Sequence, residues 1–488
     1  SELKEGDVLG FDGRTVTYAQ GKRYCHIADE NGASLKYSLD FAQNIWKERP
    51  EMSMEPVFSL EDEYTGEKIG SKLERIREIM KENGCNAHVL SSLDDIAWLL
   101  NIRGNDIAYC PLVLSYAIVY NNSVELFADI RKFSDDIINL LAENQVKIYP
   151  YEDIYRKVSE MTSEDKLLLD SSIMNYSLYQ SISKETVIVD KQNPEILMKS
   201  VKNETQAENL RKAHLKDAVA HTKFMYWLKK NIGRVEITEL SASARLEGLR
   251  GEQEHFLGPS FGPISAYGEH GAIVHYSADE KSNVPLKEGK LFMTDTGGHY
   301  LEGSTDITRT VALGEVGNIE KEHFTLVARA MLRLANTVFL YGCSGANLDC
   351  IAREVFWKEG LNFNHGTGHG VGYLLNIHEG PINFRWKEGE RPAPALEENM
   401  VITDEPGIYI EGSHGIRLEN ELLVRKTVKN EYGQFMNFEI LTYVPIDLDA
   451  ILPEKMSTEE KEMLNHYHKQ VYEKVKCPLT FQRKNESG

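Results

Sequence analysis

The chain has 488 residues, a length that exceeds one ordinary hydrophobic core and predicts two or three domains. Its formal net charge of -20 disfavours nucleic acid and anionic membrane surfaces as partners, because their phosphates would be repelled. Hydrophobic residues make up 41% of the chain, as in globular proteins, yet no run approaches the roughly 20 apolar residues of a membrane helix. Residues 1–6 are polar and lack a signal peptide's apolar region, so we expect a cytoplasmic protein.

The first 200 residues predict an α/β arrangement. Residues 1–55 are too short for a core of their own and should belong to something larger. A helix with one apolar face is then expected from about residue 70. Beyond it, strand-like runs at 87–90, 113–120 and 124–127 alternate with helical patterns near 131–145 and 151–161. The two asparagines at 121 and 122 favour a hairpin between the last two strands.

A second domain boundary is predicted near residue 202. Asn203 and Gln206 have the spacing of a capping box, and apolar residues at helical spacing continue to Lys230. Another capping box, formed by Ser457 and Glu460, predicts a helix near the end of the chain.

The six cysteines show no Cys-x-x-Cys pair, so we expect reduced thiols and neither disulfides nor thiolate metal sites. Any metal must then be bound through oxygen and imidazole. The cysteines are Cys25, Cys85, Cys110, Cys343, Cys350 and Cys477.

Two aspartates mark the first candidate site. Asp295 ends an apolar strand, and Asp306 lies on a threonine-rich segment that could return as an antiparallel strand. Such a return would bring the two carboxylates together, where their repulsion requires a bound proton or a cation. Taken alone, both aspartates could equally be turn residues.

Two glutamates are similarly ambiguous alone. Glu405 follows an apolar strand and precedes Pro406-Gly407, which could be a simple strand end. Residues 415–422 alternate like one strand, so Arg417 and Glu419 should point to the same face. The pair could also be a surface ion pair.

Histidines decide between these interpretations. His365 and His369 have the four-residue spacing of helical zinc proteases, but the glycines among residues 365–372 rule against a helix. An extended, glycine-rich segment would instead let the backbone approach a ligand closely. With His275 and His378, the stretch supplies four histidines to the segment that carries the four carboxylates. We expect structural roles for the remaining histidines considered, which are His88, His214, His221, His255, His466 and His468.

One imidazole with several carboxylates favours a hard or borderline divalent ion, and Mn²⁺, Co²⁺ and Zn²⁺ all suit this set. Two such ions could share a water molecule whose lowered pKa makes it a nucleophile.

The segments 295–306, 365–372, 403–407 and 416–420 resemble the metallopeptidases of the pita-bread fold. The likeness is strongest to the three-domain cytosolic X-Pro aminopeptidases, also called aminopeptidase P, and it extends to residues 93–104 and 271–276. The resemblance implies a creatinase-like α/β middle domain at 56–201 and a pita-bread catalytic domain at 202–488. It implies hydrolysis, through a water bridging two metals, of the first peptide bond of peptides with proline second.

The family's site residues map onto this chain one by one. His275, His365 and His378 would hold the substrate and stabilise the tetrahedral intermediate. Arg417 would support the ligands and the substrate, while Glu405 would also act as acid and base. Asp306 and Glu419 would bridge two metal ions, usually manganese. The implied metal ligands are Asp295, Asp306, His369, Glu405 and Glu419.

The chain departs from the family at its start, because residues 1–55 match only the closing part of an amino-terminal domain that contributes to a homodimer. Prolidases share the fold and ligands, but the sequences at 370–372 and 376–381 favour the aminopeptidase. A non-catalytic binding protein and a metal-free hydrolase of the same fold are disfavoured because all five ligands are present.

Overall fold

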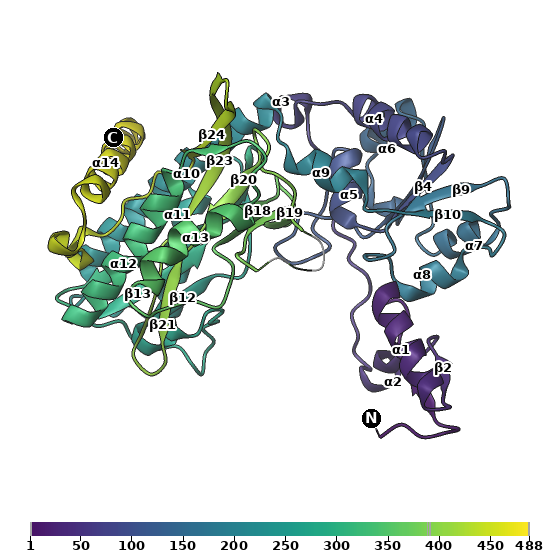
Figure 1. The fold of residues 1–488 in the computed structure, drawn as a ribbon, viewed down its shortest axis with the longest axis horizontal. Coiled ribbons are helices and arrows are strands. Elements are labelled where there is room, and N and C mark those ends of the chain that lie inside the picture. The colour runs from purple at the N-terminus through teal and green to yellow at the C-terminus, as the bar shows by residue number, and fades with distance from the viewer. Residues whose placement is uncertain (1, 388, 390–391, 487–488) are drawn as a thin grey trace. The chain divides into compact units, whose positions relative to one another are not determined.

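The computed structural model describes residues 2–387, 389 and 392–486. Residues 388, 390, 391, 487 and 488 of the predicted carboxy-terminal domain, and residue 1 of the amino-terminal segment, lie outside these ranges. The chain forms two compact units, Ser1–Lys199 and Ser200–Gly488 (Figure 1). The predicted further division at residue 55 stays a prediction. No helix among the described residues is both long and apolar enough to cross a membrane.

The amino-terminal unit is built from short helices and strands. In chain order they are β1 (Val8–Gly10), α1 (Tyr18–Glu30), β2 (Ser34–Lys36), α2 (Phe41–Ile45), β3 (Phe58–Ser59), α3 (Asp62–Thr65), α4 (Ile69–Glu82), β4 (Ala87–Leu90), α5 (Leu93–Leu99), β5 (Ile102–Arg103), β6 (Tyr116–Tyr120), β7 (Val124–Phe127), η1 (Ile130–Lys132), α6 (Asp135–Glu143), β8 (Val146–Tyr149), α7 (Asp153–Ser159), β9 (Lys166–Leu169), α8 (Tyr176–Ser181), β10 (Val187–Asp190) and α9 (Pro194–Ser200).

A six-stranded sheet of order β10-β9-β4-β6-β7-β8 forms the centre of this unit. The apolar run of β4 is buried along its whole length, as its central place requires. The predicted hairpin is confirmed, because β6 and β7 pair in antiparallel register across residues 121–123. The strand predicted for 113–120 begins only at Tyr116. The helix predicted near 131–145 begins after Ser134, whose hydroxyl accepts a hydrogen bond from Ile137 N–H and caps α6.

The first 45 residues pack on α8 through aromatic rings rather than through a core of their own. The rings of Tyr18 and Tyr179 are stacked with centroids 3.6 Å apart. Phe11 and Tyr37 each form a T-shaped contact with the ring of Tyr176, with centroid distances of 5.3 and 5.0 Å. This segment therefore depends on α8 for its aromatic contacts.

The carboxy-terminal unit carries longer helices. Its elements are α10 (Glu204–Asn231), α11 (Glu239–Gly251), β11 (Phe256–Pro259), β12 (Ile264–Tyr267), η2 (Gly268–Ala272), β13 (Lys290–Thr296), β14 (Gly298–Tyr300), β15 (Gly303–Ser304), β16 (Ile307–Leu313), α12 (Asn318–Ala335), β17 (Phe339–Leu340), α13 (Gly345–Trp357), β18 (Gly368–Val371), β19 (His378–Phe384), β20 (Val401–Asp404), β21 (Gly407–Ile410), β22 (His414–Arg417), β23 (Asn420–Asn430), β24 (Gly433–Ile440), η3 (Leu448–Ala450), η4 (Pro453–Lys455) and α14 (Thr458–Glu486).

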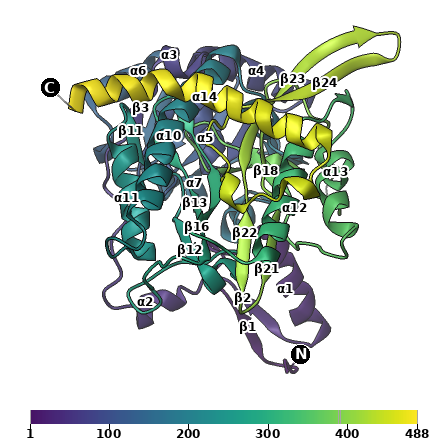
Figure 2. The ribbon, with the colours of Figure 1, turned by 90° about the vertical axis from the view of Figure 1, so that its left-hand side faces the viewer.

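Two antiparallel sheets of this unit position the candidate site. Their strand orders are β12-β13-β16 and β17-β24-β23-β20-β18-β19. Figure 2 shows helices α10 to α13 in front of these strands, with α14 crossing in front of the helices. Phe224 of α10, Phe292 of β13 and Phe324 of α12 are fully buried in the core between them. The α/β class expected from the sequence is confirmed.

Helix starts in this unit follow the predicted signals. Asn203 and Gln206 form the capping box of α10, and Ser457 and Glu460 exchange the two reciprocal hydrogen bonds that start α14. All six cysteines are free thiols, as predicted.

Candidate metal centre

Two strands bring Asp295 and Asp306 together. β13 and β16 pair in antiparallel register with Asp295 opposite Thr308, and Asp306 comes just before β16. This confirms the antiparallel return. The connection is more elaborate than a simple hairpin, because β14 and β15 lie within it. Both carboxylates are buried, with 8% and 4% of their residue surface exposed.

His369 lies on the extended strand β18, so the prediction that this stretch is not helical is confirmed. A side chain at Gly368 would place its Cβ 1.8 Å from the Thr403 carbonyl oxygen, and one at Gly370 would come 2.2 Å from the Glu379 carbonyl oxygen. Glycine on each side is therefore a steric requirement of the neighbouring strands β20 and β19.

Hydrogen bonding orients the His369 ring. Its Nδ1 is 2.9 Å from the Gly370 carbonyl, an acceptor, so Nδ1 carries the proton. Nε2 then keeps its lone pair and faces Asp306 Oδ2 at 3.4 Å and Glu405 Oε1 at 3.9 Å. This tautomer suits a metal ligand.

The two glutamates approach the same point from different strand ends. Glu405 follows β20, and its N–H donates to the Thr367 carbonyl at 2.8 Å. Glu419 accepts a 2.8 Å hydrogen bond from the Thr308 hydroxyl. Ligand atoms of Asp306, His369 and Glu419 all lie within 4.8 Å of one another, a spacing that a metal ion could fill.

The single strand expected over 415–422 is wrong. β22 ends at Arg417 and β23 begins at Asn420, because the chain passes there from the hairpin with β21 to the pairing with β20. Between the two strands, the Glu419 N–H donates to the Thr308 carbonyl of β16, so this residue belongs to neither pairing. Arg417 and Glu419 still face one group, since the Thr308 hydroxyl also accepts from Arg417 Nε at 3.4 Å.

The buried carboxylates repel one another, and a bound cation would reduce this repulsion. Burial raises the pKa of Asp306 and Glu419 well above their ordinary values, and the charge of Asp295 adds to both shifts. Burial also raises the pKa of Glu405. Among the described residues, Asp295 Oδ1 is buried with no hydrogen-bond partner. A divalent cation would satisfy this oxygen and relieve the repulsion, so the donor set fits a metal centre.

Arg417 connects the centre to the surrounding loops. Its side chain is 2% exposed, and Nη2 lies 2.6 Å from Asp295 Oδ2 and 3.3 Å from the Val274 carbonyl. The alternative of a surface ion pair with Glu419 is therefore wrong. The guanidinium binds Asp295 and the backbone beside His275 at once.

Tyr409 is a site residue that the sequence did not indicate. Arg417 Nη1 donates to its hydroxyl at 2.7 Å, and His365 Nε2 is 2.8 Å from the same hydroxyl. His365 Nδ1 lies 2.7 Å from the Gly366 carbonyl and must donate to it, so Nε2 accepts from Tyr409. A directed chain of hydrogen bonds thus runs from Arg417 through Tyr409 to His365.

The three predicted substrate histidines lie near the predicted metal ligands and Arg417. Burial is the main cause that lowers the pKa of His365 and of His378 to about 4. His378 begins β19, with its ring centroid 4.3 Å from that of His369. His275 is exposed in the turn after η2. The structure thus gathers all nine predicted site residues in one region, and their individual roles stay predictions.

A second missed group lies behind Asp306. The Asp306 N–H donates to Glu421 Oε1 at 2.6 Å, and His214 Nε2 of α10 is 3.2 Å from Glu421 Oε2. All three side chains are buried. No local pattern could have connected residues so far apart in the chain.

Three family models match the chain. Residues 48–206 match the creatinase/prolidase N-terminal domain, 208–426 match metallopeptidase family M24, and 434–486 match the C-terminal region of that peptidase. Xaa-Pro aminopeptidase 1 of Dictyostelium discoideum is 34% identical over 100% of this chain and 79% of its own length. Aminopeptidase P1 of Arabidopsis thaliana is 33% identical over 96% and 80%.

A solved structure gives the same result. The X-prolyl aminopeptidase of Caenorhabditis elegans, described as a cytosolic enzyme with a di-nuclear active site, superposes with a TM-score of 0.92 at 33% identity. The match covers 99% of this chain and 80% of that one. With relatives of this identity along almost its entire length, the chain belongs to the M24 metallopeptidases, in the group formed by the Xaa-Pro aminopeptidases.

Proposed function

We propose that this protein is a metal-dependent X-Pro aminopeptidase, which hydrolyses the bond between the first residue of a peptide and a proline at the second position. The observation that carries the proposal is the group of Asp306, His369 and Glu419, whose ligand atoms all lie within 4.8 Å of one another, with both carboxylates buried and His369 half-buried. Relatives named Xaa-Pro aminopeptidase along the full chain support the substrate class.

Two divalent ions are proposed as cofactors, with Mn²⁺ favoured and Co²⁺ or Zn²⁺ as alternatives. Asp306 and Glu419 would hold the ions together with the three other ligands. Bound there, the ions would act as Lewis acids and lower the pKa of a water molecule. The proposed ligands are Asp295, Asp306, His369, Glu405 and Glu419.

The chain's own groups would complete the reaction. Glu405, beside His369, would accept a proton from the attacking water and pass it to the departing proline nitrogen. His378 and His275 would donate hydrogen bonds to the substrate and to the developing oxyanion. His365 would be held in place by Tyr409, while Arg417 would hold Asp295 and the turn carrying His275.

A hydrolysis assay separates this function from that of a prolidase. Metal-loaded protein should release arginine from Arg-Pro-Pro and leave Gly-Pro intact. The reverse preference would identify a prolidase, and absence of both hydrolysis and bound metal would support the non-catalytic alternative. The proposed substrates are peptides with proline at the second position, and the proposed location is the cytoplasm. A second copy of the chain is a candidate partner, and analytical sedimentation would detect such a dimer.

A further inference from the structure

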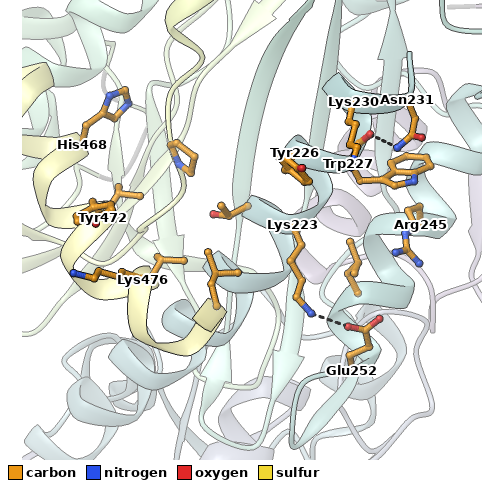
Figure 3. A pocket seen from close by; sticks show the side chains of 16 residues that line it. Lys223, Tyr226, Trp227, Lys230, Asn231, Arg245, Glu252, His468, Tyr472 and Lys476 are labelled. Atoms are coloured by element: carbon orange, nitrogen blue, oxygen red, sulfur yellow. Dashed lines mark hydrogen bonds and ion pairs between the residues drawn. The ribbon is translucent and has the colours of Figure 1, made fainter. Parts of the chain in front are cut away.

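A cavity of about 930 Å³ lies among α10, α11 and α14, and its lining shares no residue with the candidate metal centre. Figure 3 shows Tyr226 and Trp227 of α10, Arg245 of α11 and Tyr472 of α14 among its lining side chains. This volume falls within the range of sites that bind small organic molecules.

The cavity is aromatic and aliphatic. Leu249 and Val475 are buried in its lining, and Trp227 lies beside them, partly exposed. Tyr226 and Tyr472 are 59% and 63% exposed, unusually high values for large aromatic side chains. These faces offer a ring a place to stack with part of its surface removed from water.

The charge of the lining opposes that of the whole chain. Four cationic side chains and one carboxylate line the cavity, in a protein with 55 basic and 75 acidic residues. The carboxylate of Glu252 pairs with Lys223 at 3.2 Å. Within the described part of the chain, neither Lys230 nor Arg245 has a carboxylate within 4.0 Å.

The two cations without an acidic partner lie over the aromatic rings. Lys230 Nζ is 5.5 Å from the centroid of the Tyr226 ring, and Arg245 Cζ is 5.8 Å from that of Trp227. A ligand that stacks on these rings would therefore bring an acidic substituent close to both cations.

We infer that this cavity binds a small aromatic anion, with its ring against Trp227 and the tyrosines and its carboxylate or sulfonate near Lys230 and Arg245. Charge complementarity selects an anion over a neutral ring. The aromatic lining selects a planar body over an alkyl chain.

The test uses the full chain and 8-anilinonaphthalene-1-sulfonate as the fluorescent probe. We expect saturable binding with one site per chain and energy transfer from tryptophan. The neutral analogue N-phenyl-1-naphthylamine should bind at least tenfold more weakly, and decanoate should compete less well than 1-naphthoate. The double variant Lys230→Glu/Arg245→Glu should lose at least tenfold in sulfonate affinity.

A matched control is Lys290→Glu, because Lys290 Nζ lies 5.9 Å from the Tyr267 ring outside the cavity. Its probe affinity should stay within twofold. Peptide hydrolysis should be unchanged in all these variants, which reports an intact fold independently of the cavity. Equal binding of the neutral analogue, stronger competition by decanoate, or unaltered affinity in the double variant would each overturn the inference.

Discussion

Arg417 and Asp295, 122 positions apart in the chain, form a buried ion pair with Nη2 and Oδ2 separated by 2.6 Å. The same guanidinium reaches Tyr409 and the backbone beside His275. One cation thus fixes a proposed metal ligand, a hydrogen-bond chain and a substrate-facing turn.

Replacing Arg417 by Met should destabilise the metal-free protein by about 3–5 kcal/mol, because Asp295 would remain buried without its partner. Urea unfolding measures this loss. The matched control is Arg333→Met, which removes a partly exposed pair with Glu354 at 3.3 Å and should cost about 0–1 kcal/mol. Equal costs for both variants would contradict the importance assigned to the buried pair.

Replacing Tyr409 by Phe should lower kcat/KM by about 10- to 100-fold while both metal ions stay bound. The loss of the hydroxyl would free the His365 ring to rotate. Tyr267→Phe serves as the control, because that hydroxyl donates to the Lys287 carbonyl in an exposed position. Unchanged kinetics in Tyr409→Phe would show that the chain from Arg417 to His365 does not matter for catalysis.

Removal of His369 should lower the metal content. After dialysis, His369→Ala should retain at most one tightly bound ion per chain by mass spectrometry, whereas the wild type should retain two. The exposed His466 provides the control, since His466→Ala should keep the wild-type content. Two retained ions in His369→Ala would remove this residue from the ligand set.

Glu421 should affect metal binding without touching the ions. Glu421→Ala removes the acceptor of the Asp306 N–H and should weaken metal affinity about 10- to 100-fold, as loss of supporting groups does at other metal sites. Titration calorimetry would measure it, with the exposed Glu431→Ala as control. An affinity equal to that of the control would mean that Asp306 is positioned without Glu421.

His365 should make stability depend on pH. Its pKa is lowered to about 4 in the folded protein and is about 6.5 when unfolded, so the unfolded chain binds more protons between these values. Its contribution is therefore fully present above about pH 6.5 and is lost as the pH falls toward 4. Metal-free His365→Gln should show a shallower decline in unfolding free energy across this window. Parallel curves would contradict the prediction.

Local signals identified much of the fold. The strands predicted at 87–90 and 124–127 have those bounds in the structure, since their short apolar runs carry the information themselves. The capping box at Asn203 and Gln206 likewise starts α10 where expected. The predicted ligands also came from local context, a polar group at the end of an apolar strand.

Local sequence patterns could not predict contacts between distant segments. Glu421 is 115 positions from Asp306, and Tyr409 is 44 positions from His365, with no spacing rule to link them. The interruption between β22 and β23 at Leu418 could not be predicted from the sequence either. Alternation continues through it, whereas the change from one strand partner to another is a tertiary event.

The glycines beside His369 act on the site through the main chain alone. Since a Cβ at Gly368 would overlap the Thr403 carbonyl and one at Gly370 the Glu379 carbonyl, the imidazole is positioned by main chains in direct contact. Anyone who transplanted the five ligands onto another scaffold would have to carry over these two glycines and the strands that press against them. The transferable unit is a piece of backbone, and the ligand list alone would not rebuild it.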